Sequence, residues 1–435
     1  MEWKSGRGHA VLKLLAGGIR MMMRIPPQLF QLAASKRRSR QASHRLSLTA
    51  NLLTLRKEFV EELVTEWSAQ SNTAADAPSS RKEEAERALI YRIQIETEQA
   101  NRNNVTRTEA YRAVYFRCPE LHWALLAHVV SRNGGWNMTD LKGELLPRLL
   151  TEEERSRIFE LLERINALIF YDAYPQLLLY EAGKRAGLDL SDLLPVFGVS
   201  RFMKPVWTHF WQRGDSALLT TALIVNEQNV IEGRIVQDEY YRKQVLDKLV
   251  FQLQAPLQTN AVIMPYGSQN TGELQLAGLI LENFSELHER IEFGKSLYAI
   301  LFGVPQVRIG VHAFVRAVHH SGSRADYAPH LYTKHAAVSN EWAPYVQKLT
   351  GSRLNKGAAP LYSPELGEAW GDIPVKPVQP GDWFSNVKQV RAFLQTLPLP
   401  AVFEITEEHC LNINKIELAV LAAQQLGVSK RKRKK

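Results

Sequence analysis

The sequence predicts an all-α protein: one large multi-helix globular domain between disordered basic N- and C-terminal tails. Two observations support this prediction. Apolar residues recur at spacings of three and four along most of the chain, and the two-residue alternation typical of strands is scarce. A length of 435 residues with 45% hydrophobic residues is sufficient for a sizeable buried core.

Three apolar stripes and two capping pairs indicate individual helices. The stripes consist of Leu52, Leu55, Phe59, Leu63 and Trp67; of Ile158, Leu161, Leu162, Ile165, Leu168 and Ile169; and of Leu276, Ile280, Phe284, Leu287 and Ile291. Helix starts are predicted where a hydroxyl and a carboxylate three residues later satisfy each other's backbone donors, at Thr106 with Glu109 and at Thr151 with Glu154.

Interruptions of this pattern predict the domain organisation. We expect a basic tail over 1–45, a helix over 46–67, a linker over 68–80, a helical domain over 81–429 and a basic tail over 430–435. A subdivision near residue 270 is an alternative to one undivided domain. Short strands are expected over 261–264 and 400–403, and breaks at 133–135, 265–267, 321–323 and 357–381.

The net charge of +9 belongs to the two ends of the chain. Residues 1–45 carry ten bases and one acid, and residues 430–435 carry six bases. The segment between them holds 38 bases and 44 acids, so its net charge is −6. Nucleic acid is therefore an improbable partner for the folded body, and any attraction to phosphate or anionic lipid is assigned to the tails.

The amino-acid composition also predicts the cellular compartment. Cys118 and Cys410 are the only cysteines and stand far apart, so the sequence indicates neither a disulfide framework nor a paired-cysteine metal motif. No apolar run is long enough for a spanning helix, and Lys13 interrupts the one segment that resembles a signal peptide. We expect a cytoplasmic protein, with peripheral association at the inner membrane face as an addition.

A first polar cluster occupies residues 128–140, after an apolar helix. It supplies one candidate acid–base residue, His128, and five candidate ligand-binding residues: Arg132, Asn133, Trp136, Asn137 and Asp140. Ordinary helix caps and a glycine turn account equally well for most of these residue types, so this alternative stays open.

A second polar cluster occupies residues 319–330, where histidine is unusually dense. Five of the 12 histidines fall within residues 312–335. Histidine acts as a general acid or base near neutral pH, and a neighbouring carboxylate orients it. The candidates are His319, His320 and Asp326 for acid–base chemistry and Ser323, Arg324, Tyr327 and His330 for ligand binding. The alternative is a set of hydrogen-bonded helix-end and core histidines.

Neither cluster identifies a cofactor or a metal. Adjacent histidines point about 100° apart on a helix, and no established ligand spacing is present, so we predict no metal site. Ser323 lacks the glycines that flank a hydrolase nucleophile. Arg324 has the fork geometry to hold an anion. A third polar and aromatic segment, 201–213, is typical of a buried helical face rather than of nucleobase stacking.

The N-terminal tail has a basic amphipathic pattern. On a helix, Lys13, Arg20 and Arg24 lie within about 40° of one another, opposite an apolar side. Together with the basic run at 36–40, residues 8–40 could contact an anionic membrane surface. The alternatives are a disordered extension, or a later start at Met21, Met22 or Met23.

The chain resembles the YppC-like proteins of Bacillus-type bacteria, a family of unknown function. The matching stretches are residues 123–143, 276–279 through 292–295, and 321–327. The resemblance covers most of residues 100–340 and implies a bacterial, cytoplasmic, helical protein. It implies no reaction, cofactor or catalytic residue, and the basic tails lie outside it.

These observations support three hypotheses. The leading one is a helical binding or interaction protein whose two polar clusters form one pocket for a small ligand or a protein segment. The second is a hydrolase or transferase in which His128, or His319 and His320, act as acid–base groups, Asp326 orients them and Arg324 holds an anion. The third is peripheral membrane or nonspecific nucleic-acid binding through the basic tails.

Overall fold

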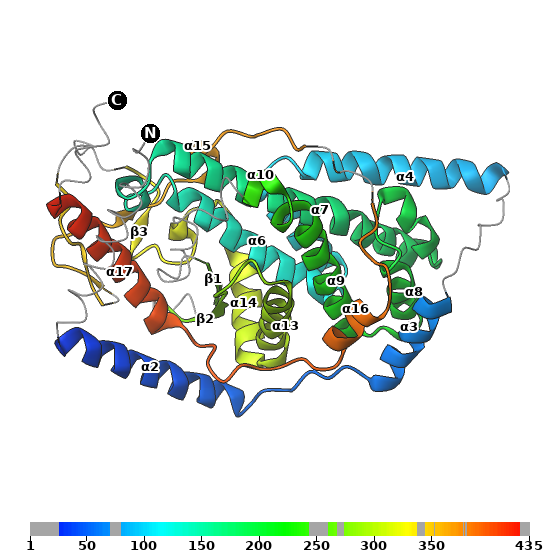
Figure 1. The fold of residues 1–435 in the computed structure, drawn as a ribbon, viewed down its shortest axis with the longest axis horizontal. Coiled ribbons are helices and arrows are strands. Elements are labelled where there is room, and N and C mark those ends of the chain that lie inside the picture. The colour runs from blue at the N-terminus through cyan, green and yellow to red at the C-terminus, as the bar shows by residue number, and fades with distance from the viewer. Residues whose placement is uncertain are drawn as a thin grey trace, which may run out of the picture.

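The computed structural model describes residues 26–69, 80–242, 260–267, 274–336, 344–351, 353–376, 378 and 381–426. Helices dominate this part of the chain, which confirms the predicted all-α class (Figure 1). Residues 1–25, the linker over 70–79 and the C-terminal basic run lie outside the described residues, as does most of the predicted amphipathic segment.

The centre of the fold is helix α6 (His122–Asp140). It is surrounded by α5 (Asn104–Arg117), α7 (Glu152–Ala186), α9 (Ser216–Ile231) and α13 (Leu287–Gly303) (Figure 1). Trp123 and Trp136 of α6 are fully buried in this environment. The prediction of a break at residues 133–135 was wrong, because α6 continues through both glycines and packs closely there against its neighbours.

Helix α7 follows the sequence pattern closely. Thr151 caps its start and forms the predicted reciprocal pair with Glu154, and the stripe over 158–169 lies within it.

Helix α5 begins earlier than predicted. Asn103 is the N-cap residue, and Thr106 is the third helical residue. The Thr106 hydroxyl accepts a hydrogen bond from the backbone N–H of Asn103, so Thr106 is the partner of the cap and not the cap itself. An Asn side chain accepts a backbone hydrogen bond as well as a hydroxyl does.

A short hairpin replaces part of the third predicted helix. Strand β1 (Ala261–Pro265) pairs antiparallel with β2 (Leu276–Ile280), so the strand expected at 261–264 is confirmed. The helix predicted from Leu276 was wrong, because α13 begins only at Leu287. Residues 400–403 form no regular strand, although the Phe403 carbonyl accepts a hydrogen bond of 2.8 Å from the backbone N–H of Gly278.

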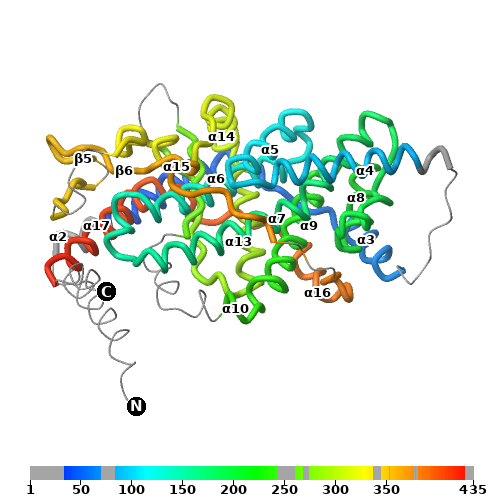
Figure 2. Tube along the Cα trace, turned by 90° about the horizontal axis from the view of Figure 1, so that it is seen from above, coloured from blue at the N-terminus to red at the C-terminus, as the bar shows by residue number. Residues whose placement is uncertain are grey.

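The N-terminal part differs from the prediction in its boundaries. Residues 26–47, placed largely in the basic tail, form helix α2 (Pro26–Ser47), and the helix expected over 46–67 is α3 (Lys57–Ala69). Leu52 and Leu55 therefore precede the helix. Helices α2 and α17 (Thr406–Gln425) lie side by side at one end of the molecule (Figure 1, Figure 2).

The remaining elements complete the frame. Trp207 and Phe210 of α8 (Met203–Arg213) are buried, which confirms core packing for the 201–213 segment. The 265–267 and 321–323 breaks are confirmed as non-helical. The other elements are α4 (Ser80–Ala100), η1 (Leu146–Arg148), η2 (Ser191–Phe197), α8 (Met203–Arg213), η3 (Glu232–Val236), α10 (Glu239–Tyr241), α14 (Pro305–Ala317), η5 (Arg324–Asp326), β3 (Tyr332–Thr333), β4 (Leu349–Thr350), β5 (Arg353–Leu354), β6 (Leu361–Tyr362), α15 (Leu366–Ala369), α16 (Lys388–Arg391) and η6 (Ala392–Leu394).

A test of length and composition finds no single helix, within the described ranges, that could span a membrane. One pair, α13 with α14, passes the test only when taken together and is bent by 90°.

Candidate functional site

The two predicted polar clusters meet in space. Asp140, at the end of α6, binds Arg324 of η5: Nε lies 2.8 Å from each carboxylate oxygen, and Nη2 lies 2.6 Å from Oδ2. Nη2 also donates to Asn137 Oδ1 at 3.2 Å, and the Thr139 hydroxyl donates to the Gly322 carbonyl at 2.6 Å. The C-terminal end of α6 and the 321–324 loop are therefore joined by several polar contacts.

Arg324 continues into a chain of hydrogen bonds. Its Nη1 donates to the Tyr327 hydroxyl at 2.8 Å, and this hydroxyl lies 3.0 Å from His409 Nε2. Arginine only donates, so the Tyr327 hydroxyl accepts from Arg324 and donates to His409 Nε2, and the proton of His409 is on Nδ1. Burial, followed by the nearby Arg324 charge, lowers the pKa of His409 to about 3, which keeps the ring neutral.

The charge of Arg324 is fixed and compensated. Burial opposes the charged form, but the Asp140 carboxylate raises the pKa of Arg324 well above its usual value. The guanidinium and the carboxylate form a bidentate pair, the arrangement that satisfies both groups best. Arg324 thus presents a polar edge with little uncompensated positive charge.

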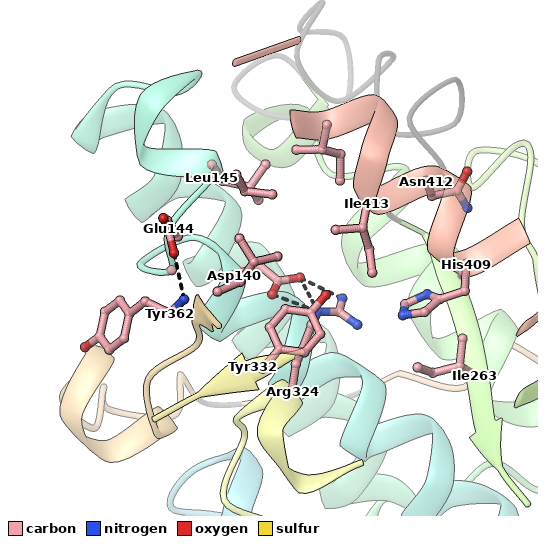
Figure 3. Close-up of a pocket in the computed structure, with 15 residues that line it drawn as sticks. Asp140, Glu144, Leu145, Ile263, Arg324, Tyr332, Tyr362, His409, Asn412 and Ile413 are labelled. Atoms are coloured by element: carbon pink, nitrogen blue, oxygen red, sulfur yellow. Dashed lines mark hydrogen bonds and ion pairs between the residues drawn. The ribbon is translucent and has the colours of Figure 1, made fainter. Parts of the chain in front are cut away.

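A pocket opens beside this pair, with a volume of about 70 Å³ (Figure 3). A water molecule needs about 10–15 Å³ on this measure, so the space holds roughly five waters or part of a small compound. The walls come from the end of α6, from β1, β3 and β6, and from α17. They comprise Asp140, Gly143, Glu144, Leu145, Leu146, Ala261, Ile263, Arg324, Tyr332, Leu361, Tyr362, His409, Asn412, Ile413 and Ile416.

Behind the pocket lies a buried polar core that contains the two candidate histidines. His128 Nδ1 contacts the Thr108 carbonyl at 2.8 Å and therefore carries the proton. His320 Nε2 contacts Asn104 Oδ1 at 2.9 Å, and Asn104 is held in that orientation because its amide nitrogen donates to the Ser131 carbonyl. Burial lowers the pKa of both histidines well below the usual value, so both rings are neutral.

Gly135 makes this packing feasible. A Cβ at this position would lie 2.4 Å from Asn104 Oδ1 and 2.5 Å from His320 Nε2. Real side chains do not tolerate such contacts, so the glycine that resembled a turn in the sequence is instead the surface against which His320 packs.

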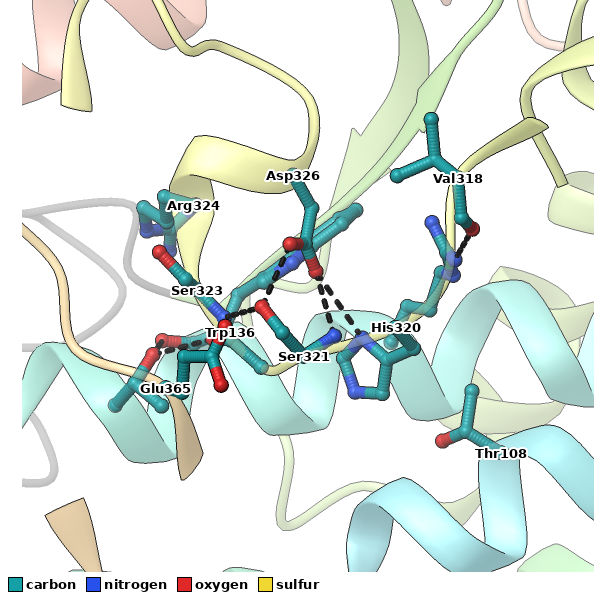
Figure 4. A network of polar contacts seen from close by, with 12 residues as sticks. Thr108, Trp136, Val318, His320, Ser321, Ser323, Arg324, Asp326 and Glu365 are labelled. Carbon is teal, nitrogen blue, oxygen red and sulfur yellow. Dashed lines mark hydrogen bonds and ion pairs between the residues drawn. The ribbon is translucent and has the colours of Figure 1, made fainter. Parts of the chain in front are cut away.

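Asp326 organises the loop that carries His320 (Figure 4). It accepts hydrogen bonds from the backbone N–H and the hydroxyl of Ser321, at 2.8 and 2.6 Å. His320 Nδ1 lies 3.8 Å from Asp326 Oδ2, and Lys334 Nζ lies 3.3 Å from Oδ1. Asp326 therefore does lie beside His320, as the acid–base hypothesis requires, but its side chain is only 2% exposed.

Arg132 lies in the same core without a carboxylate bonded to it. Its Nη2 donates to the Val318 carbonyl, and its guanidinium lies 4.7 Å from the centre of the Phe314 ring. Burial lowers its pKa to about 10. Among the described residues, its Nε and Nη1 have no hydrogen-bond partner.

The other sequence candidates divide into supporting and exposed residues. Asn133 holds β1 through two bonds of 2.9 Å to the backbone of Ile263. Ser323 donates to the Ser363 carbonyl at 2.6 Å. Trp136 packs 4.6 Å from the Tyr327 ring, centre to centre. His319 and His330 are exposed.

Two of the candidate acid–base histidines lie outside the pocket wall. His128 and His320 are fully or almost fully buried and do not line the pocket, whereas Asp140, Arg324 and His409 do. In the described part of the chain, no group of three or more His, Cys, Asp or Glu residues is arranged to hold a metal ion.

Residues 99–407 match a protein-family model described as "Protein of unknown function (DUF2515)". The chain belongs to this family. A relative from Bacillus subtilis (strain 168), described as "Uncharacterized protein YppC", is 44% identical over 246 residues, which is 57% of this chain and 75% of the relative. The predicted resemblance to YppC-like proteins is thereby confirmed. No solved structure matches the chain.

The DUF2515 match includes both polar clusters but ends at residue 407. His409, Asn412 and Ile413, which complete the pocket from α17, lie just beyond it. Sequence reasoning missed these three residues. They belong to a helix with no unusual density of polar residues, and neither spacing nor composition connects them to Arg324.

Proposed function

We propose that this member of the DUF2515 family binds a small, uncharged polar compound in the pocket beside Arg324. The observation that supports this most directly is the convergence of the two clusters: residues separated by 184 positions meet as the Asp140–Arg324 pair on the pocket wall. The pair is partly buried, with the Arg324 and Asp140 side chains 12% and 26% exposed, so its formation carries a desolvation cost. Its position at a cavity fits a binding role better than a purely structural one.

The charges of the pocket walls favour an uncharged ligand. Asp140 compensates Arg324, and Glu144 is paired with Lys348 at 2.5 Å. His409 is neutral. An ion would therefore lose its hydration without gaining a free partner of opposite charge.

Hydrogen-bond donors and apolar walls define the ligand further. The N–H of His409 and the amide of Asn412 are available to a carbonyl or hydroxyl oxygen. Ile263, Leu361 and Ile413 supply apolar walls (Figure 3). A compound with an amide, ketone or alcohol group on a short hydrocarbon body matches this combination.

A thermal-shift screen with neutral amides and alcohols tests the proposal. A compound that binds the folded state at about 100 times its Kd stabilises it by about 2.7 kcal/mol. We expect such a compound to raise the Tm of the wild-type protein and of Leu426→Trp, whose position just after α17 is 59% exposed. Ile413→Trp fills the pocket and should abolish the shift.

Each ligand-induced shift is measured from the Tm of the same variant without ligand. This reference is needed because a larger side chain in the core by itself lowers the free energy of unfolding by about 1–3 kcal/mol. Equal ligand-induced shifts in Ile413→Trp and Leu426→Trp would place binding elsewhere and contradict the proposal.

A further inference from the structure

The outward side of α2 carries a concentrated positive charge. The helix sequence contains no Asp or Glu. Lys36, Arg37, Arg40 and Arg45 are exposed, and we call these four residues the α2 basic face. Among the described residues, none of the four forms an ion pair. Their charge is therefore directed into solvent without a compensating carboxylate.

Packing against α17 fixes the orientation of this face. Ser35, Ser39 and Ser43 recur every four residues and are buried, so one narrow stripe of α2 lies against the body. The Ser43 hydroxyl accepts hydrogen bonds from the backbone N–H groups of Phe403 and Glu404, at 2.9 and 2.8 Å. At 100° per residue, Arg37, Arg40 and Arg45 lie about 100° or more from the centre of the serine stripe. Lys36 lies about 60° from it, on the edge of the helix near Lys415 of α17.

A neighbouring ion pair strengthens this arrangement. Arg38, on the flank of the helix, binds Glu407 of α17 at 2.9 Å. The pair connects α2 to α17 from the side.

Two leucines that follow α2 in the chain are exposed. Leu48 is 73% exposed and Leu52 is 71% exposed. The backbone N–H of Leu48 donates to the His44 carbonyl at 3.2 Å, so this residue still follows the helical path. At 100° per residue, Leu48 lies about 20° from Arg37 around the helix. Leu48 is therefore exposed on the same side of the helix as Arg37.

We propose that the α2 basic face, together with Leu48 and Leu52, docks on an anionic lipid bilayer. Lysine and arginine near such a surface each favour association by about fivefold, and the leucines can enter the boundary between headgroups and acyl chains. Exposed leucines add nothing to contacts with nucleic-acid phosphates.

Vesicle flotation of the full chain tests this inference. The probes are vesicles of phosphatidylcholine alone and vesicles of phosphatidylcholine and phosphatidylglycerol in equal parts. We expect the wild-type protein to float only with the anionic vesicles. The variant with Lys36→Gln, Arg37→Gln, Arg40→Gln and Arg45→Gln should bind them roughly 600-fold more weakly.

A matched control separates the surface from net charge. It carries Arg353→Gln, Lys356→Gln, Lys376→Gln and Lys388→Gln, which remove four exposed bases outside α2. We expect it to float like the wild type. Leu48→Ser with Leu52→Ser should weaken binding about tenfold while leaving the Tm unchanged.

Two outcomes would overturn the inference. In the first, the α2 variant and the control lose flotation equally, or neither loses it. Either result would show that the bases of α2 have no special role. The other is wild-type flotation by the leucine variant, combined with duplex DNA binding that depends on the α2 bases, which would assign the surface to nucleic acid.

Discussion

Replacing Arg107 with Met is expected to lower the free energy of unfolding by about 3–5 kcal/mol. Arg107 is fully buried in α5, forms an ion pair with Glu163 of α7 and donates to Asn101 twice, each time at 3.1 Å. Met has a similar volume but no charge, so the variant leaves the Glu163 carboxylate buried without its partner. Urea-induced unfolding of the two proteins measures the difference.

The double variant Arg107→Met with Glu163→Met supplies the control. Replacing both members of a buried ion pair by apolar residues is often close to neutral, so much of the lost stability should return. If the double variant lost as much as the two single variants combined, the pair would not be coupled, and the explanation would be wrong.

The second large effect is a dependence of stability on pH through Asp172. Burial raises the pKa of Asp172 from 3.8 to about 7. Its Oδ2 accepts hydrogen bonds from Gln176 at 2.9 Å and from Asn226 at 2.5 Å. Between these two pH values the folded protein holds a proton that the unfolded chain releases. Stability therefore falls as pH rises from about 4 to 7, by roughly 4 kcal/mol.

Asp172→Asn removes this titration and resembles the protonated acid in shape. We expect the variant to gain stability relative to the wild type as pH rises through this window, as measured by urea unfolding at several pH values. Asp192→Asn, whose side chain is 80% exposed, should show no comparable trend. A constant difference between wild type and Asp172→Asn from pH 4 to 8 would contradict the assignment.

The fold could be predicted where local signals and tertiary packing agree. In α7, apolar periodicity and the Thr151–Glu154 pair both favour the helix that is present. In the 276–291 segment they conflict. The apolar residues of this segment are spaced like one helix, although they belong to a strand, a turn and the start of α13. The segment begins as a strand because Leu276 and Ala277 pair with β1.

The basic N-terminal segment is a second case in which local sequence signals did not predict the structure. Its charge suggested disorder, yet α2 forms because its small serines allow close packing on α17. This information lies in the partner helix and not in the local sequence.

Two of the site residues predicted from the sequence, Asp140 and Arg324, lie on the wall of the pocket, but the assembly of the pocket was not predicted. Both polar clusters contribute to it, and Asp140 and Arg324 meet as the shared-pocket hypothesis requires. Periodicity and spacing describe local structure, so they could not show that α17 completes the pocket with His409. Nor could they distinguish Gly135 as a packing surface from a turn glycine, since that depends on Asn104 and His320.

The most direct test of the central claim is a crystal structure of the protein with the neutral compound that gives the largest thermal shift. The proposed function predicts electron density between α6 and α17, with an oxygen of the compound hydrogen-bonded to His409 or Asn412 and its hydrocarbon part against Ile413. The Asp140–Arg324 pair should remain intact beside it. Density for the compound at another position, with this pocket empty, would contradict the account.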